Sequence, residues 1–504
     1  MCYTDKDVNY PILYRDSGME FNMYIQESQL MQLLERSVSA YHTVEETEKR
    51  LQKAGFQELS GEGSWELHPN GAYYLKSGGT TLFAFVIGQH WSGAKKLRMG
   101  AAHTDYPGFS IKNNPDISAC GYQKLNVEVY GGPILNTWLD RPLSAAGQVV
   151  LRSDDVWHPH VRLVDLKKPF CIIPNLAIHM NREVNKGVAL NRQTELLPVA
   201  GLAGEDVDKE AFLTYLAKEI QVDKEDILDF DLHLYSPEKP QIIGIEEDMI
   251  SACHLDNTTS VQALLDGILD AARQVNKQTV EDGSANGKLP GRYSANKSVD
   301  EIDSDDGEQN AELIEQSDNL NGIRLMALFD HEEIGSRTKQ GAGSMLLYHV
   351  LQKIGSSAAL QKADFFAHEM SVEELCQDAM LLSVDVAHGI HPNYAGKMDL
   401  TNQPVLGKGF CIKEACSQSY ATDSFAIGIL QQICDSHHIG WQKFVNRSDQ
   451  PGGSTLGSIA SSFLPVPTVD IGVPLLSMHS VRELMGRADM EALSACISAF
   501  YRQS

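Results

Sequence analysis

The sequence predicts an α/β protein in which one mixed sheet, flanked by helices, is interrupted by a β-rich segment. Apolar runs of strand length alternate with helical patterns in residues 28–107 and again in 236–504. Between 108 and 235, short β-like runs alternate with Gly, Pro and Asn, and only residues 209–220 read as helical. At 504 residues the chain is also too long for one ordinary core. We therefore expect a first domain in two pieces and a β-rich second domain.

The N-terminal piece begins with a weakly patterned stretch. Residues 1–27 are expected to form an N-terminal extension. Apolar residues then recur at helical spacing over 28–54, and Gly55 suits the position that ends a helix. Three strand-length runs follow, at 73–75, 81–88 and 97–102.

The second piece resumes the alternation after Ile242. A helix is predicted from about His254, with an inward apolar face that includes Val261 and Leu264. Residues 276–320 are rich in Gly, Ser, Asn and acidic residues, so a flexible acidic insertion is predicted, more often a tolerated insertion than a lid. The remaining predicted elements are strands at 323–329, 380–384 and 467–473 and helices around 345–351, 421–434 and 490–500.

Composition excludes several classes of partner and compartment. A formal net charge of −25 argues against binding to nucleic acid or to anionic membrane surfaces. The nine cysteines are odd in number and form no C-x-x-C pair, which is typical of reduced thiols in a cytoplasmic protein. The first residues lack the pattern of a signal peptide, and no apolar run approaches the ~18 residues that span a bilayer. We expect a cytoplasmic protein.

Two adjacent carboxylates, Glu332 and Glu333, follow the predicted strand 323–329. Like charges side by side raise each other's pKa, and burial adds a desolvation cost. Taken alone, such a pair is more often a solvated turn. The alternative is that one glutamate binds a metal while the other faces a water at that metal.

Other predicted strands also end in polar side chains. If the strands share a sheet, these side chains meet at its carboxyl edge, where α/β sheets bind ligands. Such His and carboxylate groups suit zinc, cobalt or manganese, and they are too many for one catalytic zinc but suit two metals that share a carboxylate. The candidate residues are His103 with Asp105, Asp256, Glu332 with Glu333, Asp385, and His479.

Each of these residues also has a simpler explanation. A lone histidine at a strand end is more often a hydrogen-bonded structural residue, and Asp256 before Asn257 fits a helix N-cap. On spacing alone, His388 and His391 are equally good candidates for ligand roles.

Five motifs, in this order, resemble those of the M18 family of metallo-aminopeptidases, the aspartyl aminopeptidase family. The resemblance extends from about residue 28 to the C-terminus, with 276–320 as an additional insertion. The motifs are His103–Asp105, Leu255–Asn257, Asp330–Ser336, Asp385–His388 with His391–Asn393, and Met478–Glu483.

The resemblance implies a fold, an assembly and an activity. A zinc-peptidase-like α/β catalytic domain, formed by 28–107 and 236–504, would be split by a β-rich dimerisation domain at 108–235. The subunits would assemble as a homododecamer built from dimers. The protein would remove N-terminal residues, acidic ones among the candidates, from peptides. A related two-metal amidohydrolase acting on small N-acyl amino acids is the alternative, and a non-catalytic scaffold is disfavoured by the intact Glu332.

The resemblance also implies a cofactor and its ligands. Two divalent metal ions per subunit are expected, with zinc ahead of cobalt and manganese. His103 and Asp385 would hold one ion, Glu333 and His479 would hold the other, and Asp256 would bridge them.

Further roles carry over motif by motif. Glu332 would be the general base, and Asp105 would orient His103. His179 would complete the site of a neighbouring subunit, and Lys413 would lie near the substrate pocket.

The chain departs from the family pattern at Asn175, Thr258 and Val386. None of these positions is a predicted metal ligand. The departures leave the shape of the pocket and the substrate preference open.

Overall fold

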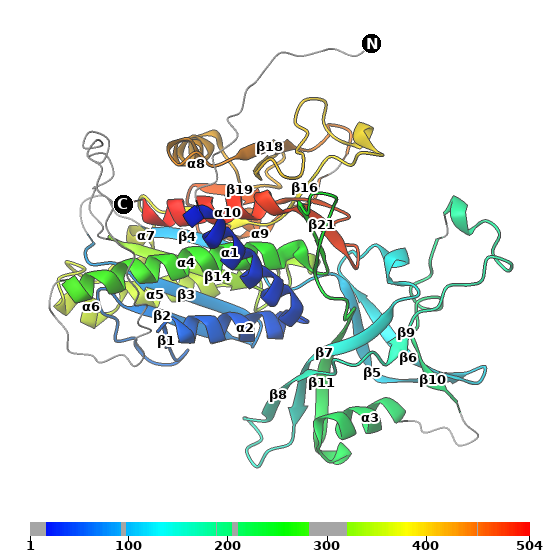
Figure 1. Ribbon diagram of the computed structural model, residues 1–504. Helices are drawn as coiled ribbons and strands as arrows, with labels where there is room; N and C mark the ends of the chain where they lie inside the picture. The colour runs from blue at the N-terminus through cyan, green and yellow to red at the C-terminus, as the bar shows by residue number, and fades with distance from the viewer. Residues whose placement is uncertain are drawn as a thin grey trace, which may run out of the picture.

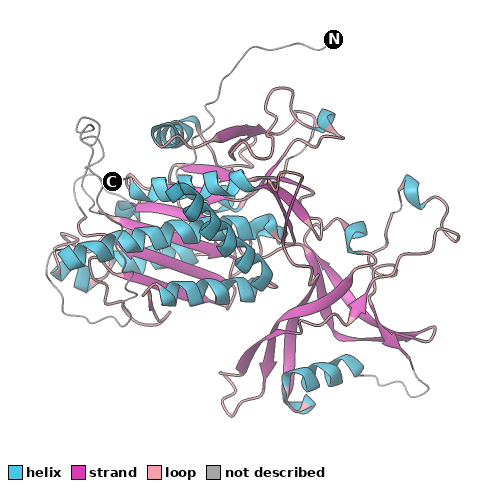
Figure 2. Ribbon diagram, in the orientation of Figure 1, coloured by secondary structure: helices cyan, strands magenta, loops and turns pink. Residues whose placement is uncertain are grey.

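The computed structural model describes residues 17–91, 97–187, 189–203, 210–281, 320–450 and 452–503. A larger α/β body carries a smaller β-rich body, which takes its strands from the cyan and green part of the chain (Figure 1). Helices cover the strands of the larger body, whereas the smaller body is mostly strand and loop (Figure 2). Of the predicted acidic insertion at 276–320, residues 276–281 continue a helix instead of beginning a loop, and 282–319 lie outside the described residues.

A nine-stranded mixed sheet forms the centre of the larger body. Its strands, in spatial order, are β1 (Gln57–Glu58), β2 (Ala72–Ser77), β3 (Thr81–Ile87), β14 (Ile323–Phe329), β4 (Leu97–His103), β15 (Met380–Val384), β19 (Thr468–Gly472), β17 (Phe410–Glu414) and β18 (Trp441–Val445). The four central strands β14, β4, β15 and β19 run parallel to one another. Every residue of β14, β15 and β19 is buried, as expected for a sheet that is covered on both faces.

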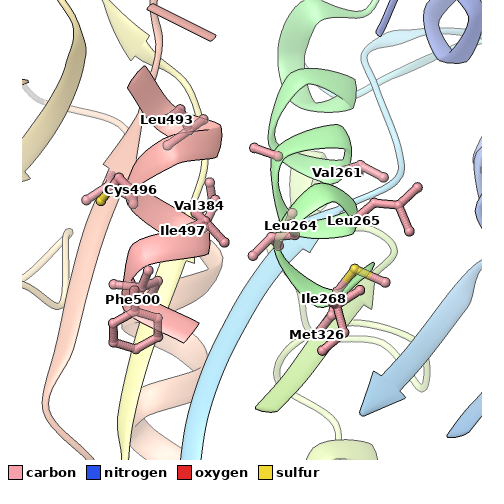
Figure 3. Close-up of a cluster of buried hydrophobic side chains, with 14 of the residues drawn as sticks. Val261, Leu264, Leu265, Ile268, Met326, Val384, Leu493, Cys496, Ile497 and Phe500 are labelled. Carbon is pink, nitrogen blue, oxygen red and sulfur yellow. The ribbon is translucent and has the colours of Figure 1, made fainter. Parts of the chain in front are cut away.

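Helices cover the two faces of this sheet. One face packs on α1 (Ser17–Arg36), α2 (Ala40–Lys53), α4 (Leu255–Glu281), α8 (Ser424–Ser436) and α10 (Arg487–Arg502). The other packs on α5 (Leu346–Gly355), α6 (Ala358–Lys362), α7 (Val372–Leu375) and α9 (Leu456–Phe463). The apolar face of α4 meets that of α10 over Met326 and Val384 of the sheet (Figure 3). Gly267 lets the two helices approach, because a Cβ there would lie 2.7 Å from Ile497 Cγ2.

The predicted helical stretch over 28–54 is two helices. The chain leaves α1 after Arg36 and begins α2 at Ala40, with Ser39 as the N-cap whose hydroxyl accepts the His42 N–H. The helical spacing of apolar residues continues across this break, so periodicity alone did not predict it. Gly55 follows the end of α2 with φ +89°, as predicted.

The β-rich body is a seven-stranded antiparallel sheet. Its strands are β5 (Gly108–Ala119), β6 (Tyr122–Tyr130), β7 (Pro142–Leu151), β8 (His160–Asp165), β9 (Cys171–Ile172), β10 (Val199–Leu202) and β11 (Ile227–Tyr235). An additional pairing of β11 with β7 closes six of these strands into a ring, which encloses its own apolar core. The predicted helix at 209–220 is α3 (Ala211–Ile220), which packs on that core. The domain boundaries at 107/108 and 235/236 stay a prediction.

A third, five-stranded sheet was not predicted. It is formed by β12 (Gln241–Ile243), β13 (Met249–Ala252), β21 (Glu483–Gly486), β20 (Pro474–Leu476) and β16 (Ala387–His388). These strands are two to four residues long, too short to show a pattern of their own. Their connections carry polar residues of the site described next. Among the described residues, no helix combines the length and the apolar character needed to cross a bilayer.

Candidate metal centre

Three neighbouring strands bring their polar ends to one edge of the central sheet. His103 is the last residue of β4, Asp385 directly follows β15, and Glu332 and Glu333 form a short 3₁₀ turn after β14. Because β14, β4 and β15 are parallel, with Phe329 opposite His103, these side chains emerge together. The convergence that the sequence predicted on the assumption of a shared sheet is therefore present.

Asp256 and His479 reach the same edge from outside this sheet. The backbone at Asp256 and Asn257 is not helical, although both residues lie at the start of α4, and Asn257 Nδ2 donates to Val384 O at 3.0 Å. His479 lies between β20 and β21 of the small sheet. The Glu483 carboxylate joins the two, because it accepts the N–H of Asp256 at 3.0 Å and that of His479 at 2.8 Å.

The predicted ligands form overlapping groups. In each group the ligand atoms lie within 4.8 Å of one another. The three groups are His103–Asp256–Asp385, Asp256–Glu333–His479 and His103–Glu332–Glu333. Asp256 belongs to two of them, and its oxygens face different histidines: Oδ1 lies 3.3 Å from His103 Nε2, and Oδ2 lies 3.5 Å from His479 Nε2.

The donor set fits a cation. Among the residues that the structure describes, no hydrogen bond reaches the buried Oδ1 of Asp256. Its neighbour is His103 Nε2 at 3.3 Å, and a cation bound by both atoms would stabilise a buried carboxylate oxygen that otherwise accepts no hydrogen bond. Histidine nitrogens with carboxylate oxygens are the ligands that zinc accepts. His388 is exposed, and neither it nor His391 belongs to any of the three groups. Spacing alone therefore gave these two histidines more weight as ligand candidates than the structure supports.

Without a cation, burial and the neighbouring carboxylates make the ionised forms of Glu332 and Glu333 unfavourable. Burial raises the pKa of Glu332 to about 8; His103 opposes this rise, and the carboxylates of Asp385 and Asp105 add to it. Burial, followed by the charge of Asp256, raises the pKa of Glu333 well above its usual value. A cation between these groups would favour their ionised forms.

Asp105 lies next to His103 on the side away from the other predicted ligands. Burial would lower the pKa of the His103 ring, but interactions with Asp105, Asp256 and Asp385 outweigh it and raise that pKa. His103 Nδ1 lies 3.0 Å from the Asp105 carbonyl oxygen and 3.4 Å from Oδ1, so the ring donates from Nδ1 and turns Nε2 toward the ligand groups. The Asp105 carboxylate also accepts the N–H of Glu332 at 3.1 Å and that of Glu333 at 3.2 Å.

A cavity of about 360 Å³ opens over these residues. Besides the predicted ligands and Glu332, it is lined by His388, Lys413, Tyr420, Gly453, Ser454, Thr455 and Met478, among others. Lys413 is buried; its Nζ donates to Val386 O at 3.0 Å and lies 3.5 Å from Asp385 Oδ2. A larger groove of about 840 Å³ between α2 and β8 includes none of the predicted site residues, and ion pairs such as Lys239–Glu35, at 2.7 Å, already join its charged groups.

His179 does not line this cavity. It lies exposed in the segment between β9 and β10, among other exposed residues. Within one chain, the structure therefore brings together eight of the nine predicted site residues and leaves His179 outside. Sequence reasoning missed Glu483, which stands inside a quoted motif, and Tyr130, whose hydroxyl donates to Asp105 Oδ2 at 2.7 Å. The only sequence signal near Tyr130 is the Gly131-Gly132-Pro133 turn that follows it.

Comparison with known proteins identifies the same family that the sequence motifs resemble. The family profile described as "Aminopeptidase I zinc metalloprotease (M18)" matches residues 33–283 and 309–501. A probable M18 family aminopeptidase 2 of Clostridium novyi (strain NT) is 40% identical over 464 residues, which cover 92% of this chain and 95% of the relative.

Solved structures share the fold over nearly the whole chain. The chain in the cryo-EM structure of the Ape4 and Nbr1 complex superposes with a TM-score of 0.80 at 29% identity, covering 96% of this chain and 87% of the other. The structure of the S. cerevesiae mApe1 dodecamer gives a TM-score of 0.73 at 22% identity and covers 96% and 97% of the two chains. At that identity, the second likeness concerns the fold alone.

Proposed function

Because the chain belongs to the M18 family of aminopeptidases, which are zinc metalloproteases, we propose that it removes N-terminal residues from peptides in the cavity over His103 and Glu332. The observation that carries this proposal is the position of Asp256. One of its oxygens faces His103 and the other faces His479, and Asp256 belongs to two of the groups of possible ligands.

In this proposal two divalent cations bind per chain, with zinc ahead of cobalt and manganese. His103 and Asp385 hold one ion, Glu333 and His479 hold the other, and Asp256 bridges them. Two of the three ligand groups, His103–Asp256–Asp385 and Asp256–Glu333–His479, overlap at Asp256, and this overlap supports the division. When bound, the cations acidify water and polarise the carbonyl group of the substrate.

Glu332 has the role of general base in the same proposal. It takes a proton from the attacking water and passes it to the leaving amine. Two features support this role: Glu332 lines the cavity, and its carboxylate belongs to one group of possible ligand atoms with His103 and Glu333, so it lies beside the place where the cations would bind. Asp105 holds the turn that carries Glu332 through the backbone N–H of that residue, at 3.1 Å.

Two residues are assigned to the substrate. Lys413 supplies a positive charge at the wall of the cavity, which would favour an acidic N-terminal side chain. Its contacts with Val386 O and Asp385 assign it a second role, that of orienting Asp385. His179, exposed in its own chain, would complete the site of a neighbouring subunit in a homododecamer built from dimers. The mApe1 protein, which has the same fold, has been solved as a dodecamer.

The proposed compartment is the cytoplasm, and the proposed partners are peptides and copies of the same chain. The eight cysteines that the structure describes are all free, as in a reducing compartment. The net charge of −25 disfavours nucleic acid and anionic membranes as partners.

A panel of chromogenic aminoacyl amides tests the proposal. We expect the metal-free protein to be inactive and added zinc, cobalt or manganese to restore cleavage, most strongly for Asp or Glu amides if Lys413 selects the side chain. Glu332→Gln should lower kcat by about 10²–10⁴-fold while the bound metal is retained. N-acetyl amino acids complete the panel, because cleavage of these compounds alone would indicate the amidohydrolase. A fully active, metal-loaded Glu332→Gln variant would rule out Glu332 as the base.

A further inference from the structure

Residues Tyr130–Ile134 connect the end of β6, in the β-rich ring, to the metal centre of the larger body. Resting on the proposed function, we propose that this segment positions both halves of the metal centre, with Tyr130 acting through Asp105 and the Gly132 carbonyl acting on His479. No part of the segment carries a predicted ligand or base, so its role is to orient the residues that do.

Tyr130 controls the half of the centre that contains His103. Its hydroxyl donates to Asp105 Oδ2 at 2.7 Å. The same carboxylate accepts the N–H groups of Glu332 and Glu333 and lies 3.4 Å from His103 Nδ1. Without the Tyr130 hydroxyl, Asp105 would lose one of the bonds that fix its plane, and the histidine and the Glu332–Glu333 turn would lose orientation together.

Gly132 controls the other half. Its carbonyl oxygen lies 3.1 Å from His479 Nδ1, so it accepts the ring N–H and leaves Nε2 for Asp256 and Glu333, each 3.5 Å away. Ile134 N–H donates to the carbonyl oxygen of His479 at 2.9 Å. The ring and the backbone of His479 are therefore both held by this segment. A carbonyl on the far nitrogen of a metal-binding histidine is the usual device for fixing its tautomer.

Gly131 makes the close approach possible. Its φ of +66° favours glycine, and a Cβ there would lie 3.2 Å from Glu333 Cβ and 3.4 Å from Glu333 O. The segment thus lies tightly against the Glu332–Glu333 turn, and a side chain at this position would press on Glu333. Any residue larger than glycine would have to displace Glu333 or bend the segment away from His479.

Residues of the β-rich ring of strands and of α2 determine the position of the Tyr130 side chain. Its aromatic ring meets the His233 ring edge to face at 5.5 Å, and His233 Nε2 lies 3.0 Å from Asp231 Oδ1. Tyr41 of α2 donates to the other oxygen of Asp231 at 2.8 Å. The strands β6 and β11 of the β-rich ring therefore help to determine the geometry of the metal centre, together with the central sheet.

The test compares Tyr130→Phe with Tyr235→Phe. Tyr235, on β11, is a matched control, because its hydroxyl donates at 2.6 Å to Asp165 of β8, which lies in the same β-rich sheet and is not a predicted ligand or base. Each full-length variant is stripped of metal, titrated with Co²⁺ against a chromophoric chelator, and examined for its visible absorption and for kcat and KM. We expect Tyr130→Phe to bind Co²⁺ about 10–100-fold more weakly, to show a changed visible spectrum, and to lose kcat with little change in KM. Tyr235→Phe should keep the wild-type affinity and spectrum.

Wild-type Co²⁺ affinity and spectrum in Tyr130→Phe would overturn the proposal, and so would an equal loss in Tyr235→Phe. If Tyr130→Phe does not fold, Gly131→Ala provides the test, with weakened binding and an altered spectrum expected from the displaced Glu333. Failure of the proposed function has a different signature: the wild-type protein would bind Co²⁺ and cleave none of the amides, while the affinities and spectra of the variants could still be compared.

Discussion

Asp256 is the residue on which the proposed metal centre depends most, because its two oxygens face different histidines: Oδ1 lies 3.3 Å from His103 Nε2, and Oδ2 lies 3.5 Å from His479 Nε2. Its neighbours determine its protonation state. Burial would raise the pKa of its carboxyl group, but His103 and His479 outweigh that effect and lower the pKa below its usual value. Glu483 supports it from behind through the backbone N–H. An ionised, buried carboxylate with one oxygen that accepts no hydrogen bond among the described residues is a ligand prepared for a cation.

Asp489 illustrates a buried carboxylate with a structural role. It lies in the first turn of α10 and accepts the N–H groups of Gly407 at 2.7 Å and Gly409 at 2.8 Å. Burial raises its pKa to about 7, although these backbone bonds oppose the shift. Since the folded pKa exceeds the unfolded value of about 4, the folded state binds the extra proton, and this contribution to stability is lost as pH rises from about 4 through 7.

We therefore predict a pH-dependent effect of Asp489→Asn. The variant should lower Tm at pH 5, and the deficit should shrink by pH 8, because only the wild type loses the protonated form over that range. The change corresponds to ~1–3 kcal/mol, or a few degrees. Thermal scans at both pH values measure it, with Asp154→Asn at an exposed position as the control. A deficit that is equal at pH 5 and pH 8 would show that Asp489 does not titrate in this way.

At the scale of elements, the strands of the central sheet and their polar ends could be predicted from sequence. In β4, β14 and β15 the apolar run and the polar residue that ends it are adjacent in the chain, so a local reading includes both. The position of the Glu332–Glu333 turn followed in the same way. The break between α1 and α2 was missed because apolar spacing continues through it.

Other elements required contacts between distant parts of the chain. The strands of the small sheet have two to four residues, and β13, in the middle of the chain, pairs with β21 near the C-terminus. Tyr130 lies next to Asp105 only because β6 of the ring returns to the edge of the central sheet. His388 had the spacing of a ligand, but β16 places it in the wall of the cavity and outside the three ligand groups. Local patterns carry no signal for these long-range placements.

At the scale of the whole molecule, the exposure of His179 is the feature that a single chain leaves unexplained. Its neighbours Leu176, Ile178 and Met180 are large apolar side chains that are more than half exposed. Exposed apolar residues beside a polar one are typical of a surface that another subunit covers. This agrees with the proposal that the segment contacts a neighbouring copy.

Complementation between two inactive variants tests that proposal. We predict that His179→Ala and Glu332→Gln each lose most activity alone, and that dissociating and reassembling them together restores part of it. On random pairing of a 1:1 mixture, up to about a quarter of the sites combine an intact Glu332 with a neighbour's His179. Reassembly of each variant with itself is the control, and sedimentation confirms that the mixture is assembled. A fully assembled mixture without recovered activity would exclude the role of His179 across subunits.

The central claim is a centre of two cations bridged by Asp256. Titrating the metal-free protein with zinc, while measuring bound metal per chain and the rate of aminoacyl amide cleavage, tests this claim most directly. We predict two ions bound per chain, with activity that requires them, and a loss of both metal affinity and activity in Asp256→Asn. Full activity with one ion or none, or an Asp256→Asn variant that still binds two ions tightly, would contradict it.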